Sequence, residues 1–276
     1  MKVAVLGSSG QVGSHLVNYL KERDHVVHGY DIVPGDATDF TIDLSTSKSF
    51  TPSSLNGVDF VYFLAFDVGG SRYLKQYQDT YHFMHNNTSL MSNVFNVLQT
   101  TNIPFIFTSS QMANMSYSPY GILKTIGELY TKTLNGLVVK FWNVYGVEHD
   151  LEKSHVITDF IIKARDTGKI DMMTDGTEVR QFLHADDCSE CLEILAQKYS
   201  QIDRSKELHV TNFQWHSILE VANMIVQHFP KCKVMPSDNK DTVQQDKRNE
   251  PDSYILNYWQ PRISLPEGID SIIKQL

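Results

Sequence analysis

The chain opens with a short apolar run that leads directly into a glycine-rich loop and then into an amphipathic segment. Residues 3–6 are continuously apolar, which is typical of a strand buried on both faces. Gly7, Gly10 and Gly13 follow, and apolar residues then recur at helical spacing over residues 12–21. In such a unit the first glycine permits a tight turn, the second lets the backbone approach a pyrophosphate, and the third lets the helix pack closely on the strand. This opening therefore predicts a parallel α/β fold that binds a dinucleotide.

The residues expected to hold the dinucleotide lie in this loop and at the ends of the next two strands. The N-terminus of the first helix presents free N–H groups to phosphates. Asp31 closes a second predicted strand, and a carboxylate there accepts both ribose hydroxyls of NAD and repels the 2′-phosphate of NADP. No arginine lies in the loop or just after Asp31, so NAD is the expected cofactor. Asp43 and Leu44 follow a third short run and are expected near the adenine. The expected contacts in the loop are Gly7, Ser9, Gly10, Gln11, Val12 and Gly13.

Strand and helix patterns alternate over the first half of the chain. Strands are predicted at 3–6, 25–30, 58–65, 103–108 and 137–141, and helices at 12–21, 88–100 and 120–134. This alternation predicts a Rossmann-type, doubly wound parallel sheet. After residue 146 the regular alternation of strand and helix patterns ends. Helices are expected at 155–167, 185–198, 217–228 and 267–276, and residues 208–211 return one strand to the main sheet. We therefore expect an NAD-binding Rossmann domain over 1–146 and a smaller, mixed α/β substrate-binding lobe over 147–276.

The composition of the chain argues against several classes of binding partner. The 276 residues carry a formal net charge of −8, which argues against binding to nucleic acid or to an anionic membrane surface. No apolar stretch approaches the length of a membrane span, and the first residues do not resemble a signal peptide. The three cysteines offer no disulfide framework, so a cytoplasmic location is expected. Cys188 and Cys191 form a C-x-x-C without a second half-site, so we expect helix packing there and no metal site.

Tyr120 and Lys124 form the most informative pair in the chain. Because they are four residues apart in a predicted helix, their side chains lie on one face. A nearby ammonium stabilises a phenolate, so the tyrosine could act as a base near neutral pH. Upstream, Ser109 and Ser110 end a predicted strand and could place a hydroxyl beside the same substrate oxygen.

Together these features resemble the extended short-chain dehydrogenase/reductase family, in particular its NAD-dependent nucleotide-sugar epimerase/dehydratase branch. The resemblance covers nearly the whole chain, and the motifs occur in the order of the family. It implies that Leu64 and Ala65 lie beside the dinucleotide and that Tyr120, Lys124 and Ser110 are catalytic. Asn143, in the segment Asn-Val-Tyr-Gly, and Arg180 and Arg248 would bind the substrate, with both arginines on its diphosphate. Residues 67–70 and 86–88 are also similar to segments of the GDP-mannose 3,5-epimerases.

The expected reaction is epimerisation of a nucleotide-diphosphate sugar. Tyr120 would remove a hydroxyl proton while hydride leaves the same carbon for NAD. Ser110 would hydrogen-bond the developing ketone, and Lys124 would lower the pKa of Tyr120 and anchor the nicotinamide ribose. The hydride then returns to the other face of the sugar. An NAD(P)H-dependent reductase of a nucleotide-linked keto sugar is the alternative, and a protein that binds NAD without chemistry is a third. The resemblance also implies a homodimer formed by the helices at 88–100 and 120–134.

The chain departs from the family pattern at several positions. Gln111 and Met112 stand where the 4,6-dehydratases carry an Asp-Glu pair, which argues against elimination of water. Met112 also weakens the comparison with the 3,5-epimerases, because it cannot act as a second acid or base. Phe66 replaces a small residue and is expected to crowd the rim of the cofactor site, and Lys140 replaces an arginine. An alternative for Arg180 is a structural ion pair with Asp186 or Asp187.

Overall fold

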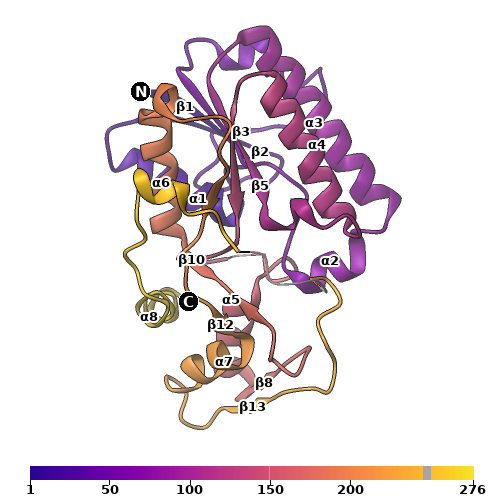
Figure 1. Cartoon of the computed structure of the whole chain (residues 1–276), viewed down its shortest axis with the longest axis vertical. Coiled ribbons are helices and arrows are strands. Elements are labelled where there is room, and N and C mark those ends of the chain that lie inside the picture. Colours follow the sequence, from indigo (N-terminus) through magenta and orange to yellow (C-terminus); the bar gives the residue numbers. More distant parts are fainter. Residues whose placement is uncertain (149, 245–249) are drawn as a thin grey trace.

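The computed structural model describes residues 1–148, 150–244 and 250–276, and this part of the chain is built around a parallel sheet of seven strands (Figure 1). The strand order is β11-β6-β5-β4-β1-β2-β3. The chain leaves β1 in one direction along the sheet and later returns to β1's other side at β4, which is the topological switch point where open α/β sheets bind ligands. The predicted Rossmann-type fold is confirmed. The strands are β1 (Lys2–Leu6), β2 (Val26–Asp31), β3 (Phe40–Thr41), β4 (Phe60–Phe63), β5 (Phe105–Ser110), β6 (Leu137–Phe141) and β11 (Leu208–Val210).

Helices cover both faces of this sheet because its strands are apolar on both sides. In β1, Val3 and Val5 enter one core while Ala4 and Leu6 enter another, as the alternation of a strand requires. One face is covered by α1 (Gln11–Lys21) and α6 (Ala185–Gln197), and the other by α3 (Tyr81–Thr101) and α4 (Pro119–Thr133). Two short 3-10 turns, η1 (Pro52–Leu55) and η2 (Gln111–Asn114), follow β3 and β5.

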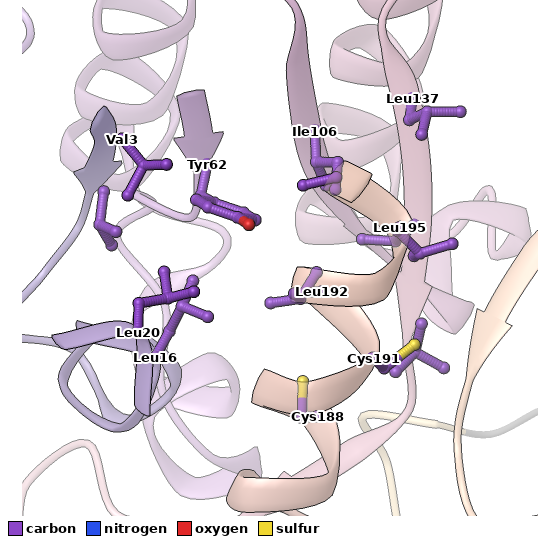
Figure 2. Packing of buried hydrophobic residues seen from close by; sticks show 14 of the residues in the cluster. Val3, Leu16, Leu20, Tyr62, Ile106, Leu137, Cys188, Cys191, Leu192 and Leu195 are labelled. Atoms are coloured by element: carbon purple, nitrogen blue, oxygen red, sulfur yellow. The ribbon is translucent and has the colours of Figure 1, made fainter. Parts of the chain in front are cut away.

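The core between α1, α6 and the sheet explains the C-x-x-C. Figure 2 shows Cys188 and Cys191 on α6 among Leu16 and Leu192, facing the strands. Both thiols are free and fully buried. Burial raises the pKa of each thiol, so both stay protonated and act as small apolar groups. Their predicted role in helix packing is confirmed.

The second half of the chain forms a smaller region below the sheet in Figure 1 and has its own core. It also returns two elements to the first half: β11 pairs with β6, as predicted, and α6 packs on α1. Its other elements are α5 (Val156–Thr167), β8 (Lys169–Asp171), β9 (Val179–Arg180), β10 (Phe182–His184), η3 (Tyr199–Gln201), β12 (His216–Ser217), α7 (Ile218–Val226), β13 (Lys233–Met235), η4 (Ser253–Asn257) and α8 (Leu265–Gln275). Because β7 (Asn143–Tyr145) pairs with β10, the ranges 1–146 and 147–276 interlock at their junction.

Two helices differ from the sequence prediction. The structure contains α2 (Ser71–Tyr77), which was missed, and α3 begins at Tyr81, seven residues earlier than expected. Asn87, which precedes the predicted start of this helix, is fully buried in α3. Its side chain donates to the carbonyls of Phe83 and Asp67 at 3.0 and 3.1 Å and accepts from the Asp67 N–H at 2.8 Å. Asn87 thus joins α3 to the segment that follows β4. In the described ranges, no helix is long and apolar enough to cross a membrane.

Candidate active site

The glycine loop lies at the carboxyl end of β1, and the surroundings of its three glycines differ. Gly7 has a φ of +90°, and a Cβ there would lie 2.6 Å from the Ala65 nitrogen. A Cβ on Gly13 would lie 1.9 Å from the Gly7 carbonyl oxygen, so this glycine lets α1 approach the loop. At Gly10 a Cβ would meet nothing closer than the Gly7 oxygen at 3.4 Å, an ordinary contact.

Gly10 therefore tests whether the loop fits a dinucleotide. Gly10 is exposed, its backbone is extended, and it precedes α1 without a side-chain cap for the helix. Among the residues that the structure describes, no contact requires a glycine at this position. The space that a side chain would fill lies in front of the free N–H groups of α1, which is the place for a pyrophosphate. The loop geometry thus fits NAD.

Asp31 lies at the end of β2, directly beside the loop. Its carboxylate accepts from the Ser9 N–H at 2.9 Å and from the Val33 N–H at 3.0 Å. The Ser9 hydroxyl bonds in turn to the Val33 carbonyl and to Thr38. Each carboxylate oxygen keeps free lone pairs, so Asp31 is fixed in place and can still accept ribose hydroxyls.

The remaining predicted cofactor contacts surround the same strand ends. The Leu64 N–H donates to the Leu6 carbonyl at 2.9 Å, which places Leu64 and Ala65 against Gly7. Asp43 accepts from the backbone and the hydroxyl of Ser45, so its side chain closes a turn. The side chain of Leu44 is buried in the core behind β1, away from the surface. The contact of Asp43 and Leu44 with the adenine stays a prediction.

Gln11 and Val12 begin α1 and link it to the second half of the chain. With its amide oriented by the hydrogen-bond network, Gln11 donates to the Val144 carbonyl at 3.2 Å and accepts from the Gly146 N–H at 3.0 Å. Val12 packs against the α1 core.

Ser110, Tyr120 and Lys124 meet beyond the carboxyl end of β5. Ser110 ends β5, and its hydroxyl accepts from the Met112 N–H at 3.1 Å. Tyr120 and Lys124 share the buried face of α4. Burial raises the pKa of Tyr120 to about 12, although a hydrogen bond with Ser110 opposes the rise. Burial lowers the pKa of Lys124 to about 7, and the nearby charge of Glu128 limits the fall. The three predicted residues are brought together, with Tyr120 resting as a phenol.

Phe66 covers Lys124 in this arrangement. The ammonium donates to the Thr108 carbonyl at 2.8 Å and lies 3.8 Å from the centre of the Phe66 ring. The Tyr120 ring meets the same phenylalanine edge to face, with 5.7 Å between ring centres. Phe66 therefore encloses the Tyr–Lys pair, and the ring face gives the ammonium a cation–π partner.

A buried ion network that the sequence analysis missed supports these residues from behind. Glu128 accepts from the Ser109 hydroxyl at 2.6 Å and lies 3.6 Å from the Lys140 ammonium. Lys140 also pairs with Glu207 at 2.6 Å. Glu128 follows Lys124 by one helical turn, and that spacing was the available signal. The partner on β6 could not be inferred from spacing along the chain.

A cleft of about 1040 Å³, part of it open to solvent, lies between α2 and the second half of the chain. Asn143 on β7 and Arg180 on β9 both line it. Asn143 donates to the Gln181 carbonyl at 3.1 Å, and Arg180 donates to the Asp241 carboxylate at 2.5 Å. The alternative pairing of Arg180 with Asp186 or Asp187 is thus replaced by one with Asp241. Arg248 lies outside the described residues. Among the described side chains, no group of three or more His, Cys, Asp or Glu residues could hold a metal ion.

Residues 67–70 connect the Rossmann sheet to this cleft. The Gly70 N–H donates to the Lys153 carbonyl at 2.9 Å, and a Cβ on Gly70 would lie 2.5 Å from the Ser154 oxygen. The Lys153 ammonium pairs with Asp67 at 2.9 Å. This close approach holds one wall of the cleft against the strand ends.

Comparisons with known proteins agree with this geometry. The chain is 24% identical over 331 residues to an uncharacterized UDP-glucose epimerase, YtcB, of Bacillus subtilis, and the match covers 100% of this chain and 98% of the relative. It is 23% identical to GDP-mannose 3,5-epimerase of Arabidopsis thaliana, over 98% of this chain and 80% of the relative. The fold is similar to that of a UDP-glucose 4-epimerase of Thermotoga maritima, with a TM-score of 0.83 at 18% identity, over 99% of this chain and 98% of that one.

The family assignment rests on a match over three quarters of the chain. The profile described as "NAD dependent epimerase/dehydratase family" matches residues 3–210, which include the glycine loop, β5, α4 and β7. A solved NAD-dependent NDP-hexosamine 5,6-dehydratase of tunicamycin biosynthesis also shares the fold, with a TM-score of 0.81 at 17% identity, over 99% of this chain and 96% of that one. Epimerases and dehydratases thus share this scaffold. The chain belongs to the NAD dependent epimerase/dehydratase family.

Proposed function

We propose that the protein is an NAD-dependent epimerase of a nucleotide-diphosphate sugar. The observation that carries this proposal is the meeting of Ser110, Tyr120 and Lys124 beyond the carboxyl end of β5, at the same edge of the parallel sheet as the glycine loop. Relatives over nearly the whole chain are epimerases of UDP-glucose and GDP-mannose by name. Gln111 and Met112 supply no acid–base pair for elimination of water, which favours epimerisation over dehydration.

The glycine loop would hold the pyrophosphate of NAD, and Asp31 its adenosine ribose. NAD would supply a reversible acceptor for the hydride of one sugar carbon. Asn143 and Arg180 line the cleft, and the guanidinium of Arg180 would exchange Asp241 for the substrate diphosphate, since a guanidinium fork suits phosphate oxygens.

The proton chemistry falls to Tyr120. As a phenol with a pKa of about 12, Tyr120 is suited to donate to the oxygen of a keto sugar. To remove a hydroxyl proton it must become a phenolate, and a protonated Lys124 stabilises that charge. Ser110 would donate a second hydrogen bond to the same oxygen. The hydride leaves the carbon as the proton leaves its hydroxyl, both return after the keto sugar has turned, and the net redox change is zero.

The test incubates the protein with UDP-, GDP- and dTDP-linked sugars and follows the sugar protons by NMR. We expect one nucleotide sugar to convert to an epimer without consumption of added NAD(P)H. Tyr120→Phe should lower the rate at least ~10³-fold, within the range of lost acid–base catalysis, while NAD binding is kept. Near-normal activity of Tyr120→Phe would refute this mechanism, and consumption of NAD(P)H with a keto sugar would identify a reductase instead.

A further inference from the structure

A carboxylate–imidazole pair, Glu148 and His155, borders the cleft and has no part in the function described so far. Glu148 lies just after β7, and His155 is the residue that precedes α5. One carboxylate oxygen of Glu148 accepts from the His155 N–H at 2.8 Å, and the other lies 2.7 Å from the imidazole Nδ1. Two bonds from one carboxylate fix both the backbone and the ring of His155.

The two members of this pair have different access to the cleft. The Glu148 side chain is only 7% exposed, whereas the His155 side chain is 37% exposed and lines the cleft. Since Nδ1 faces Glu148, the opposite edge of the ring, which carries Nε2, is available to a ligand. Across the described ranges, no side chain hydrogen-bonds this Nε2.

The start of α5 adds partial positive charge at the same place. The helix has 12 residues and begins without a side-chain cap, and its first residues, Val156 and Ile157, also line the cleft. The N–H groups of a first helical turn attract anions. The imidazole therefore lies beside a backbone site of the same preference.

The other charged groups of the cleft are largely committed to one another. Arg72 pairs with Asp159 at 3.2 Å, and Arg180 pairs with Asp241 at 2.5 Å. The partner of His155 is different, because Glu148 lies behind the ring and leaves its front edge free. The further charged residues that line the cleft are Lys75, Glu178 and Lys240, the last of which pairs with Asp175.

We propose that His155, held in position by Glu148, is a cationic ligand for the diphosphate of the substrate, so that substrate affinity falls when His155 loses its proton. This inference rests on the proposed function, because it assumes a nucleotide-diphosphate ligand in the cleft. It adds a histidine, the side chain that ordinarily changes charge near physiological pH, to the charged groups of the cleft.

The direction of the pH effect follows from the surroundings of the ring. Burial alone would lower the pKa of His155, but the charge and the hydrogen bond of Glu148 outweigh it and raise this pKa above its ordinary value. Burial likewise opposes ionisation of Glu148, yet His155 holds the pKa of this carboxyl below its usual range. The imidazolium thus persists to higher pH than in a free histidine, and binding weakens as the pH rises through its pKa.

The experiment measures binding of UDP-, GDP- and dTDP-sugars to the NAD-loaded protein by calorimetry, from about pH 6 to about pH 8.5. The diphosphate diesters keep their charge over this range. For the sugar that binds, we expect the affinity of the wild type to fall about tenfold with rising pH, the loss of one charge-assisted hydrogen bond. His155→Asn should bind about tenfold more weakly at low pH and show no fall, and His155→Lys should bind well throughout. Glu148→Gln should move the fall to lower pH.

His25 provides the matched control. It also pairs with a glutamate, Glu193 on α6, at 3.0 Å, but it lies just before β2 and does not line the cleft. His25→Asn should leave both the affinity and its pH dependence unchanged. NAD binding and far-ultraviolet circular dichroism report whether each variant is folded. Binding that does not respond to pH or to His155 overturns this inference alone, whereas a folded, NAD-loaded wild type that binds none of these sugars overturns the proposed function as well.

Discussion

Replacing Gly10 and Gly13 with alanine separates the part of the glycine loop that serves folding from the part that serves the cofactor. At Gly13 the new Cβ would lie 1.9 Å from a backbone oxygen, so α1 must move away from the loop. Such overpacking costs about 3 kcal/mol. At Gly10 the nearest atom is at 3.4 Å and the backbone, with φ −68° and ψ 165°, is open to any residue. The lower entropy of the unfolded chain offsets the poorer cap, so the free energy of unfolding should change by less than about 1 kcal/mol.

For NAD affinity, the direct effect is expected from Gly10→Ala. The methyl group of Gly10→Ala occupies the space in front of the first N–H groups of α1, and loss of one or two bonds to the pyrophosphate weakens binding by about 1.5 to 3 kcal/mol, or about tenfold to hundredfold. Urea unfolding measures the stability of each variant, and calorimetric titration measures NAD binding.

Gly13→Ala is the control, because its effect on NAD should accompany a loss of stability that Gly10→Ala lacks. If Gly10→Ala is stable and binds NAD as tightly as the wild type, the pyrophosphate does not approach Gly10 and the fit of the loop to NAD is wrong. If Gly10→Ala is strongly destabilised, folding itself requires a glycine at this position, and the reasoning from the contacts around Gly10 is wrong.

Three further outcomes are expected. Lys140→Met should lower the free energy of unfolding, measured with urea, by about 3 kcal/mol, because it leaves Glu128 buried without its cation. Lys140→Arg should keep most of the stability, and equal losses in the two variants would refute an ionic role. The pKa of Lys124 falls from 10.5 to about 7 on folding, so between these pH values the unfolded chain binds one more proton than the folded chain. The stability of the wild type relative to Lys124→Met should therefore rise from about pH 7 to about pH 10.5. A difference that does not change with pH would contradict the burial of the Lys124 ammonium. Leu129 is 58% exposed on α4, and Leu129→Glu should convert the predicted homodimer to a monomer in sedimentation experiments. A variant that stays dimeric would contradict a dimer interface at this face of α4.

The sequence predicts what depends on neighbours along the chain. The glycine loop, the strand alternation and the Tyr120–Lys124 spacing are all local, and the structure realises each of them. The contacts between distant segments could not be read this way. Arg180 was expected near Asp186 or Asp187, yet it pairs with Asp241, 61 residues away. The hydrogen bonds between Asn87 of α3 and Asp67, 20 residues away, likewise have no signal in local spacing.

The buried ions behind the active site show why such contacts matter for its chemistry. Ser109 precedes Ser110 at the end of β5, and Glu128 lies one turn beyond Lys124 on α4. The hydrogen bond of 2.6 Å between Ser109 and Glu128 joins the strand that carries the Ser110 hydroxyl to the helix that carries the Tyr–Lys pair. Lys140 on β6 neutralises Glu128 at the position where the family often has an arginine. A lysine offers one ammonium in place of a planar fork, and it divides its contacts between Glu128 and Glu207. The relative placement of Ser110 and Lys124 is therefore fixed by a charge network that joins β5, β6, α4 and Glu207, the residue before β11. The strength of this network sets how closely the two functional groups are held.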